Sequence, residues 1–188
     1  HLLEEKFNEV EFDKQKALLI VGGDNCDRGK HSRKILDYMN EPWYNSIIGN
    51  HELLFMRTFE GDKDWKECFL KNGGVWYLSL FEDEKHSIYQ YFDSLPLSIE
   101  LKLPNGKNVG FIHAEVPYNN WGFLRKDEEN KTVVGLESNY LGTAVWFREV
   151  WEKYHNVKNP PYKVEGIDKV YVVHTVVKID GYNSPKRI

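Results

Sequence analysis

Cysteine is scarce in this sequence. Cys26 and Cys68 are the only two cysteines among 188 residues, and two cysteines cannot form a disulfide framework. Cys26 also lies inside a polar motif, described below, where a disulfide bridge would distort the backbone. We therefore expect both thiols to stay reduced and the protein to work in the cytoplasm.

Long apolar runs and an excess of basic residues are also missing. No apolar run approaches the ~20 residues of a membrane-spanning helix. The start, His1–Glu5, has neither the basic flank nor the long apolar stretch of a signal peptide. The formal net charge is -4, whereas nucleic-acid-binding domains are usually clearly basic. We expect neither a membrane nor a nucleic acid as partner.

What is present is the composition of an ordinary globular protein. Hydrophobic residues make up 41% of the chain and charged residues 29%, both common values for soluble domains. A chain of this length can bury a sizeable core, and no repeat or linker interrupts it. We expect a single domain over residues 1–188.

Two polar motifs each follow a short apolar run. Ala17–Val21 leads into Gly22-Gly23-Asp24-Asn25-Cys26-Asp27-Arg28-Gly29, and Ser46–Ile48 leads into Gly49-Asn50-His51-Glu52. Apolar runs that precede helical patterns indicate parallel strands, and such sheets bind ligands at the carboxyl ends of their strands. Asp, Asn and His are ligands for divalent metals, and Arg binds phosphate-like anions through two parallel hydrogen bonds. These groups are therefore expected at one edge of a sheet.

The spacing of apolar residues predicts the other elements. Residues 97–103 and 108–113 alternate in hydropathy around Pro104-Asn105-Gly106-Lys107, which is typical of a β-hairpin. The hairpin adds an antiparallel pair, so the fold class is expected to be α/β with a mixed, two-sheet sandwich. Residues 117–140 show no period and are expected to form a surface loop or cap. Helices are expected over residues 2–10, 31–39, 62–71, 84–94 and 143–154, and a last strand over 169–174.

The motifs resemble those of a known family. Gly23-Asp24-x-x-Asp27-Arg28-Gly29 and Gly49-Asn50-His51-Glu52 are similar to the second and third signature blocks of the calcineurin-like metallophosphoesterases. The resemblance is strongest to the bacteriophage lambda type of serine/threonine protein phosphatase, and it implies a metallophosphoesterase-like β-sandwich flanked by helices. Four further segments follow in the family's order and rough spacing: Asn72-Gly73-Gly74-x-Trp76, Leu95-Pro96-Leu97, Ile112-His113-Ala114-Glu115 and Val145-Trp146-Phe147-Arg148-Glu149.

The resemblance implies a set of metal ligands. Two ions about 3.5–4 Å apart can neutralise the charge that builds on a phosphoryl group. By resemblance Asp24 would bridge the two ions, and Asn50, His113 and His174 would bind the second one. Mixed Asp, Asn and His donors suit Mn²⁺, with Fe or Zn as alternatives.

The resemblance also implies catalytic residues. His51 would donate a proton to the leaving oxygen, and a hydrogen bond to Asp27 would orient it. Arg28 and Arg148 would bind the phosphate oxygens. The residues alone leave structural roles open. Asp24 and Asp27 could cap a helix, Asn50 could be a turn residue, and His51 could be an N-terminal helix residue. His113 could be a buried core histidine, His174 could have a structural role, and Arg148 could be a helix residue that extends its guanidinium to solvent.

Two signature blocks of the family have no counterpart in the chain. The first, Gly-Asp-x-His-Gly, supplies two ligands of the first metal, and the last is an Asp-Thr-Gly strand. The sequence is therefore either a fragment of a longer chain or a relative that has lost the first metal site; we favour the fragment. These residues supply one metal site.

The function expected from the resemblance is a metal-dependent phosphoesterase that uses metal-activated water to hydrolyse phosphate monoesters, most of all on protein Ser and Thr or else on small molecules. One alternative is a hydrolase of dinucleoside polyphosphates, which shares these motifs. Another is a non-catalytic relative that binds a phosphorylated ligand or a partner protein. The sequence indicates neither the physiological substrate nor an oligomeric state.

Overall fold

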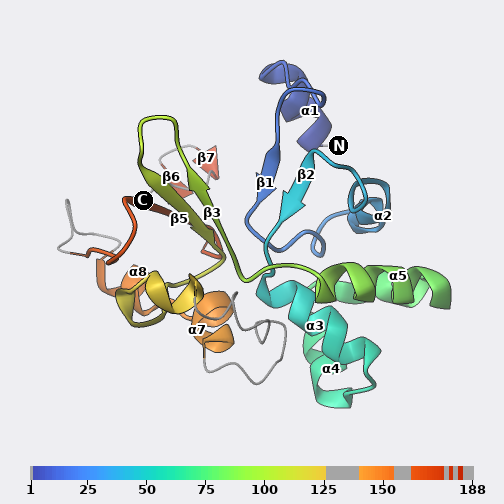
Figure 1. Cartoon of the computed structure of the whole chain (residues 1–188). Coiled ribbons are helices and arrows are strands. Elements are labelled where there is room, and N and C mark those ends of the chain that lie inside the picture. The colour runs from blue at the N-terminus through green and yellow to red at the C-terminus, as the bar shows by residue number, and fades with distance from the viewer. Residues whose placement is uncertain (1, 126–139, 155–161, 176–177, 180–181, 184–188) are drawn as a thin grey trace. The chain divides into compact units, whose positions relative to one another are not determined.

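The structure is a computed structural model, which describes residues 2–125, 140–154, 162–175, 178–179 and 182–183 (Figure 1). Its internal contacts divide the chain into two compact units. The first unit holds residues 1–21, 25–46 and 51–92, and the second holds residues 22–24, 47–50 and 93–188. The expectation of a single domain over residues 1–188 stays a prediction.

The first unit is built on two parallel strands. β1 (Leu19–Val21) pairs with β2 (Tyr44–Ser46) so that Val21 lies opposite Ser46. The second apolar run is therefore strand only up to Ser46, and Ile47 and Ile48 continue as buried irregular chain. The helices of this unit are α1 (Leu2–Glu9), the 3₁₀ turn η1 (Ser32–Lys34), α2 (Ile35–Tyr38), α3 (Asn50–Phe59), α4 (Lys63–Lys71), the 3₁₀ turn η2 (Gly74–Ser79) and α5 (Glu82–Asp93).

Helix α4 shows why these segments begin and end where they do. The carboxylate of Asp62 accepts hydrogen bonds from the backbone N–H groups of Asp64 at 3.0 Å and Trp65 at 3.1 Å, which caps the helix start. The helix ends at Lys71, and Gly73 follows with a φ of +105°. A glycine in this left-handed conformation is a common helix stop. The helix predicted over residues 62–71 is thus confirmed.

Aromatic side chains form the core of the first unit. The Phe55 side chain is fully buried and its ring lies within 6.0 Å, centroid to centroid, of four other rings. Edge-to-face and stacked pairs at this spacing add to the free energy gained from burial alone. The four partners come from α4, η2 and α5, so the core ties α3 to each of them: Phe69, Trp76, Tyr77 and Phe92.

The second unit contains a three-stranded mixed sheet. β3 (Ser98–Lys102) pairs antiparallel with β4 (Asn108–Ile112), and β4 pairs parallel with β5 (Lys169–Val172). This confirms both the hairpin and the mixed sheet. Among the residues that the structure describes, this unit also contains the 3₁₀ turn η3 (Pro117–Asn119), α7 (Leu141–Trp146), α8 (Glu149–Tyr154), β6 (Lys178–Ile179) and β7 (Tyr182–Asn183), and residues 122–125 are helical.

Two predictions about this unit were wrong in part. Residues 117–140 were expected on the surface, yet Trp121 and Leu124 are each only 1% exposed. A Cβ added to Gly110 would lie 2.3 Å from the Trp121 ring, so the indole packs directly on β4. Residues 126–139 lie outside the described part. The helix predicted over 143–154 is broken after Trp146, because Phe147 is extended with a ψ of 148°.

A carboxylate anchors the Trp121 segment to the sheet. Glu100 accepts a hydrogen bond from Trp121 Nε1 at 2.9 Å and two from Arg125, at 2.7 Å and 2.6 Å. The hydrogen bonds from Arg125 hold the pKa of Glu100 below its usual value, and partial burial opposes them. A pKa that folding lowers contributes stability above the unfolded pKa, and that contribution is lost as the pH falls through the folded pKa.

We expect Glu100→Gln to lower the free energy of unfolding by roughly 1 kcal/mol at pH 7, a figure limited by solvent screening of the half-exposed Arg125. The difference from the wild type should stay constant down to about pH 5 and shrink below the unfolded Glu pKa of about 4.3. Urea denaturation at pH 7, 5, 4 and 3 measures it. If the difference in free energy of unfolding persisted at pH 3, the effect would come from the packing of the amide and not from the charge of Glu100.

Candidate metal centre and acid–base pair

The two polar motifs leave neighbouring parallel strands. The first follows β1 and the second follows β2, so both begin at the carboxyl ends of a parallel pair. Within the first motif, Asp24, Asp27 and Arg28 have φ values of +54°, +76° and +56°. Residues other than glycine adopt positive φ at a cost of order 1–3 kcal/mol each, and such residues cluster at functional sites. The surrounding contacts must hold this loop in place.

His113 is the centre of a cluster of metal-ligand side chains in the second unit. It directly follows β4, and its side chain is 1% exposed. Three atoms surround its Nε2: His174 Nδ1 at 2.9 Å, Asn50 Oδ1 at 3.0 Å and Asp24 Oδ1 at 3.5 Å. The ligand atoms of Asp24, His113 and His174 all lie within 4.8 Å of one another. The structure thus brings together the four residues expected to bind metal.

The other ring nitrogen of His113 sets its tautomer. Nδ1 lies 2.7 Å from the carbonyl oxygen of Gly22, and a carbonyl can only accept, so Nδ1 carries the hydrogen. Nε2 of the neutral ring then presents a lone pair toward the cluster. Metal-binding histidines commonly fix their orientation through this kind of second hydrogen bond.

The donor set of this cluster fits a divalent cation. Asn50 Oδ1 and a carboxylate oxygen of Asp24 lie 3.0 Å and 3.5 Å from His113 Nε2, and all three are lone-pair atoms. Lone pairs directed at the same place repel unless a cation or a proton lies between them. Oxygen and imidazole donors in this mixture suit Mn²⁺, Fe and Zn²⁺.

An acid–base pair lies in the first unit. His51 Nδ1 is 2.5 Å from Asp27 Oδ2, and the two side chains are 3% and 0% exposed. Trp76 Nε1 donates to the other carboxylate oxygen of Asp27, also at 2.5 Å. The backbone N–H of Asp27 donates to Ser32 Oγ at 3.0 Å. A buried carboxylate bound on both oxygens can hold an imidazole in one orientation, as general acid catalysis requires.

The two arginines predicted to bind phosphate are both exposed. Arg28 lies against Gly73, where an added Cβ would come within 2.5 Å of the Arg28 backbone nitrogen. Arg148 lies between α7 and α8 instead of inside the helix predicted for it. The next segment is held by Glu115, whose Oε1 accepts the backbone N–H of Val150 at 2.6 Å. An exposed guanidinium is available to an anion.

Sequence reasoning gave no role to Glu52, although it ends the second motif. Glu52 is fully buried, and its Oε1 accepts from Asn25 N at 2.7 Å and from Asn25 Nδ2 at 3.1 Å. The Tyr44 hydroxyl donates to Asn25 Oδ1 at 2.6 Å, and burial raises the pKa of Tyr44 well above its usual value. Glu52 therefore ties α3 to the first motif. Its place in the motif was the only available signal.

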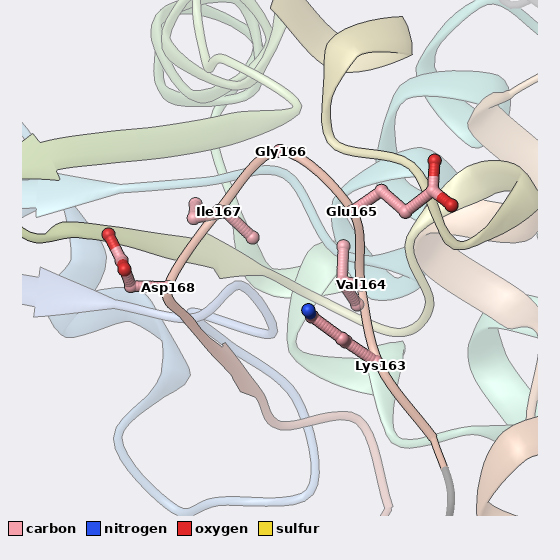
Figure 2. Close-up of a pocket in the computed structure, with 6 residues that line it drawn as sticks. All are labelled: Lys163, Val164, Glu165, Gly166, Ile167 and Asp168. Carbon is pink, nitrogen blue, oxygen red and sulfur yellow. The ribbon is translucent and has the colours of Figure 1, made fainter.

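A cavity of about 590 Å³ lies elsewhere, along residues 163–168 (Figure 2). Its walls carry both charge signs, from Lys163, Glu165 and Asp168, together with apolar Val164 and Ile167. Asp168 is already engaged, because its Oδ2 accepts the backbone N–H of Asn108 at 2.7 Å. None of the predicted site residues lines this cavity.

Comparison with known proteins identifies the family. A family model of calcineurin-like phosphoesterases matches residues 1–182, and the chain therefore belongs to this family and carries its mixed α/β metallophosphoesterase domain. Use of a divalent metal goes with the family. None of the described helices combines the length and apolar character that a bilayer-spanning segment requires.

Individual relatives carry more specific names. Serine/threonine-protein phosphatase 2 of Escherichia coli is 33% identical over 134 residues, which cover 69% of this chain and 60% of the relative. Serine/threonine-protein phosphatase 1 of Salmonella typhimurium is 27% identical over 180 residues, 94% of this chain and 74% of the relative. A bis(5'-nucleosyl)-tetraphosphatase of Oceanobacillus iheyensis is 28% identical over 174 residues, 86% of this chain and 68% of the relative. The chain thus spans about 60% of the first of these proteins.

Gly23 allows the first motif to pass close to the second. It has a φ of +86°, and an added Cβ would lie 2.8 Å from both Gly49 N and His113 Nδ1. Gly61 has a similar φ of +95° with nothing within 4 Å, so it is a matched control. We expect Gly23→Ala to lower the free energy of unfolding by roughly 1–3 kcal/mol more than Gly61→Ala, because overpacking adds to backbone strain. Urea denaturation measures the free energy of unfolding of both variants. Equal losses would show that the atoms around Gly23 move to accommodate the added methyl group.

Proposed function

We propose that the chain is a metal-dependent phosphoesterase that hydrolyses phosphate monoesters, with phosphorylated Ser and Thr side chains of proteins as substrates. The observation that carries the proposal is the convergence of Asp24, Asn50 and His174 on Nε2 of His113. The named activity of the protein phosphatase relatives supports the choice of substrate. We also propose a cytoplasmic location, because two cysteines among 188 residues cannot form a disulfide framework.

Asp24, Asn50, His113 and His174 would hold the ion, for which we propose Mn²⁺. When bound, a divalent ion acts as a Lewis acid toward phosphoryl oxygens. The carboxylate of Asp24 supplies the negative charge of the site. The Nδ1–H of His113, donated to the carbonyl of Gly22, leaves Nε2 of the neutral ring as the nitrogen that would bind the ion.

The chain's own side chains handle the substrate and its proton. Arg28 and Arg148 would bind phosphoryl oxygens through paired N–H donors and stabilise charge in the transition state. His51 would deliver a proton from Nε2 to the leaving oxygen, while Asp27 accepts its Nδ1–H and stabilises the imidazolium form. Water would be the nucleophile: a new P–O bond forms to the water oxygen as the ester P–O bond breaks, and the products are an alcohol and inorganic phosphate.

Binding of Mn²⁺ tests the metal site without reference to activity. We expect the wild-type chain to bind Mn²⁺, and we expect His113→Ala to bind it at least tenfold more weakly, because second-shell and ligand losses cost 10–100-fold in affinity. His86→Ala is the matched control, since His86 is exposed on α5. Isothermal titration calorimetry, or loss of the free-Mn²⁺ electron paramagnetic resonance signal, measures the binding. Equal affinity in His113→Ala and wild type would contradict the site.

Hydrolysis of p-nitrophenyl phosphate in the presence of Mn²⁺ tests the activity. We expect turnover in the wild type and a loss of about 10² or more in Asp24→Asn. We expect a much smaller loss in His51→Asn with this ester, because p-nitrophenolate leaves readily without a proton. A panel of a phosphoseryl peptide and a bis(5'-nucleosyl) tetraphosphate then separates the proposed substrate from the one in the name of the Oceanobacillus relative. Binding of the phosphopeptide without turnover by the folded chain would favour the non-catalytic alternative.

A further inference from the structure

Trp76 contacts the acid–base pair from a motif that the proposed mechanism does not use. It ends the segment Asn72-Gly73-Gly74-x-Trp76 and lies in η2. Its Nε1 is 2.5 Å from Asp27 Oδ1, while Asp27 Oδ2 is 2.5 Å from His51 Nδ1. An indole N–H can only donate, so this oxygen of Asp27 acts as an acceptor. Each oxygen of the buried carboxylate thus has its own partner.

The indole ring is itself held in place. It stacks on Phe55 with centroids 5.9 Å apart and an interplanar angle of 27°. Phe55 lies one helical turn after His51 on α3, so the two residues share a face of that helix. Trp76 therefore contacts the helix that carries the imidazole and the loop that carries the carboxylate.

The backbone of the same motif packs on this loop as well. A Cβ on Gly73 would lie 2.5 Å from Arg28 N and 3.0 Å from Arg28 Cα, so the close approach requires glycine. Asp27 and Arg28 adopt positive φ values, which are unfavourable for residues other than glycine. A carboxylate on such a loop, bound through one oxygen alone, could rotate about its Cβ–Cγ bond. The second hydrogen bond, from Trp76, fixes its plane.

We propose that Trp76 is a positioning residue for the Asp27–His51 pair, and that its indole N–H sets the direction in which His51 delivers a proton. This inference rests on the proposed role of His51 as general acid. Its consequence depends on the substrate. Leaving groups that are poor without protonation should depend on Trp76, and good leaving groups should not.

Trp76→Phe tests the inference, because it removes the N–H and keeps a ring against Phe55. With phenyl phosphate, whose phenol has a pKa of about 10, we expect kcat to fall roughly tenfold or more, against the 10²–10⁴ of a complete general acid. With p-nitrophenyl phosphate, which leaves readily as the anion, we expect less than about threefold. KM should be unchanged for both. The matched control is Trp65→Phe on α4, for which we expect no difference between the two esters.

The outcomes separate this inference from the proposed function. Suppose that Trp76→Phe lowers kcat equally on both esters, while His51→Asn still lowers kcat more on phenyl phosphate than on p-nitrophenyl phosphate. This result would overturn the positioning role alone. If His51→Asn also lowered kcat equally on both esters, the general-acid proposal would be overturned.

A measurement without substrate tests the contact from the other side. The indole N–H resonance of Trp76, assigned by its absence in Trp76→Phe, should move upfield in Asp27→Asn and stay in place in Trp65→Phe. A Trp76 resonance that does not respond to Asp27→Asn in the folded chain would overturn the inference even if no ester were hydrolysed.

Discussion

The hydrogen bond from His113 Nδ1 to the carbonyl of Gly22 is the interaction on which the proposed metal centre depends. It joins the end of β4 to the start of the first motif and fixes the tautomer, so that Nε2 is the nitrogen left to face Asp24, Asn50 and His174. The close passage of Gly23 beside the His113 ring follows from this bond, since a larger residue would separate donor and acceptor. The geometry of the cluster thus depends on the backbone carbonyl of Gly22 and on the absence of a side chain at Gly23.

The acid–base pair depends on a different kind of support. Asp27 has a backbone φ of +76°, which costs backbone strain, and its side chain is fully buried, which raises the free energy of the carboxylate unless hydrogen bonds compensate. Compensation comes from three directions, through His51, Trp76 and the Ser32 hydroxyl that receives its backbone N–H. Because these partners come from separate segments, the pair exists only when the first unit is folded. This explains why a strained loop is tolerated there.

Local signals predicted much of the fold, and long-range packing decided the rest. The Asn105-Gly106 turn and the Asp62 cap act within a few residues, so the hairpin and α4 were visible in the sequence. The burial of Trp121 depends on its contact with Gly110 on β4, and the break at Phe147 on one extended backbone angle. In the candidate site, the motifs correctly indicated which side chains lie around His113. Their spacing did not indicate the bonds of Trp76 to Asp27 or of Glu52 to Asn25, which form only when distant segments pack.

Asn50, His51 and Glu52 show how much one short motif can do when a helix begins inside it. Successive residues of a helix point in directions about 100° apart, so three neighbours can serve three different partners. Asn50 faces His113, His51 faces Asp27, and Glu52 faces Asn25. The proposed metal ligand, the proposed proton donor and a structural anchor are therefore consecutive in the chain. Changing the start of α3 by a single residue would displace all three at once, and this constrains the motif more tightly than any one of its roles.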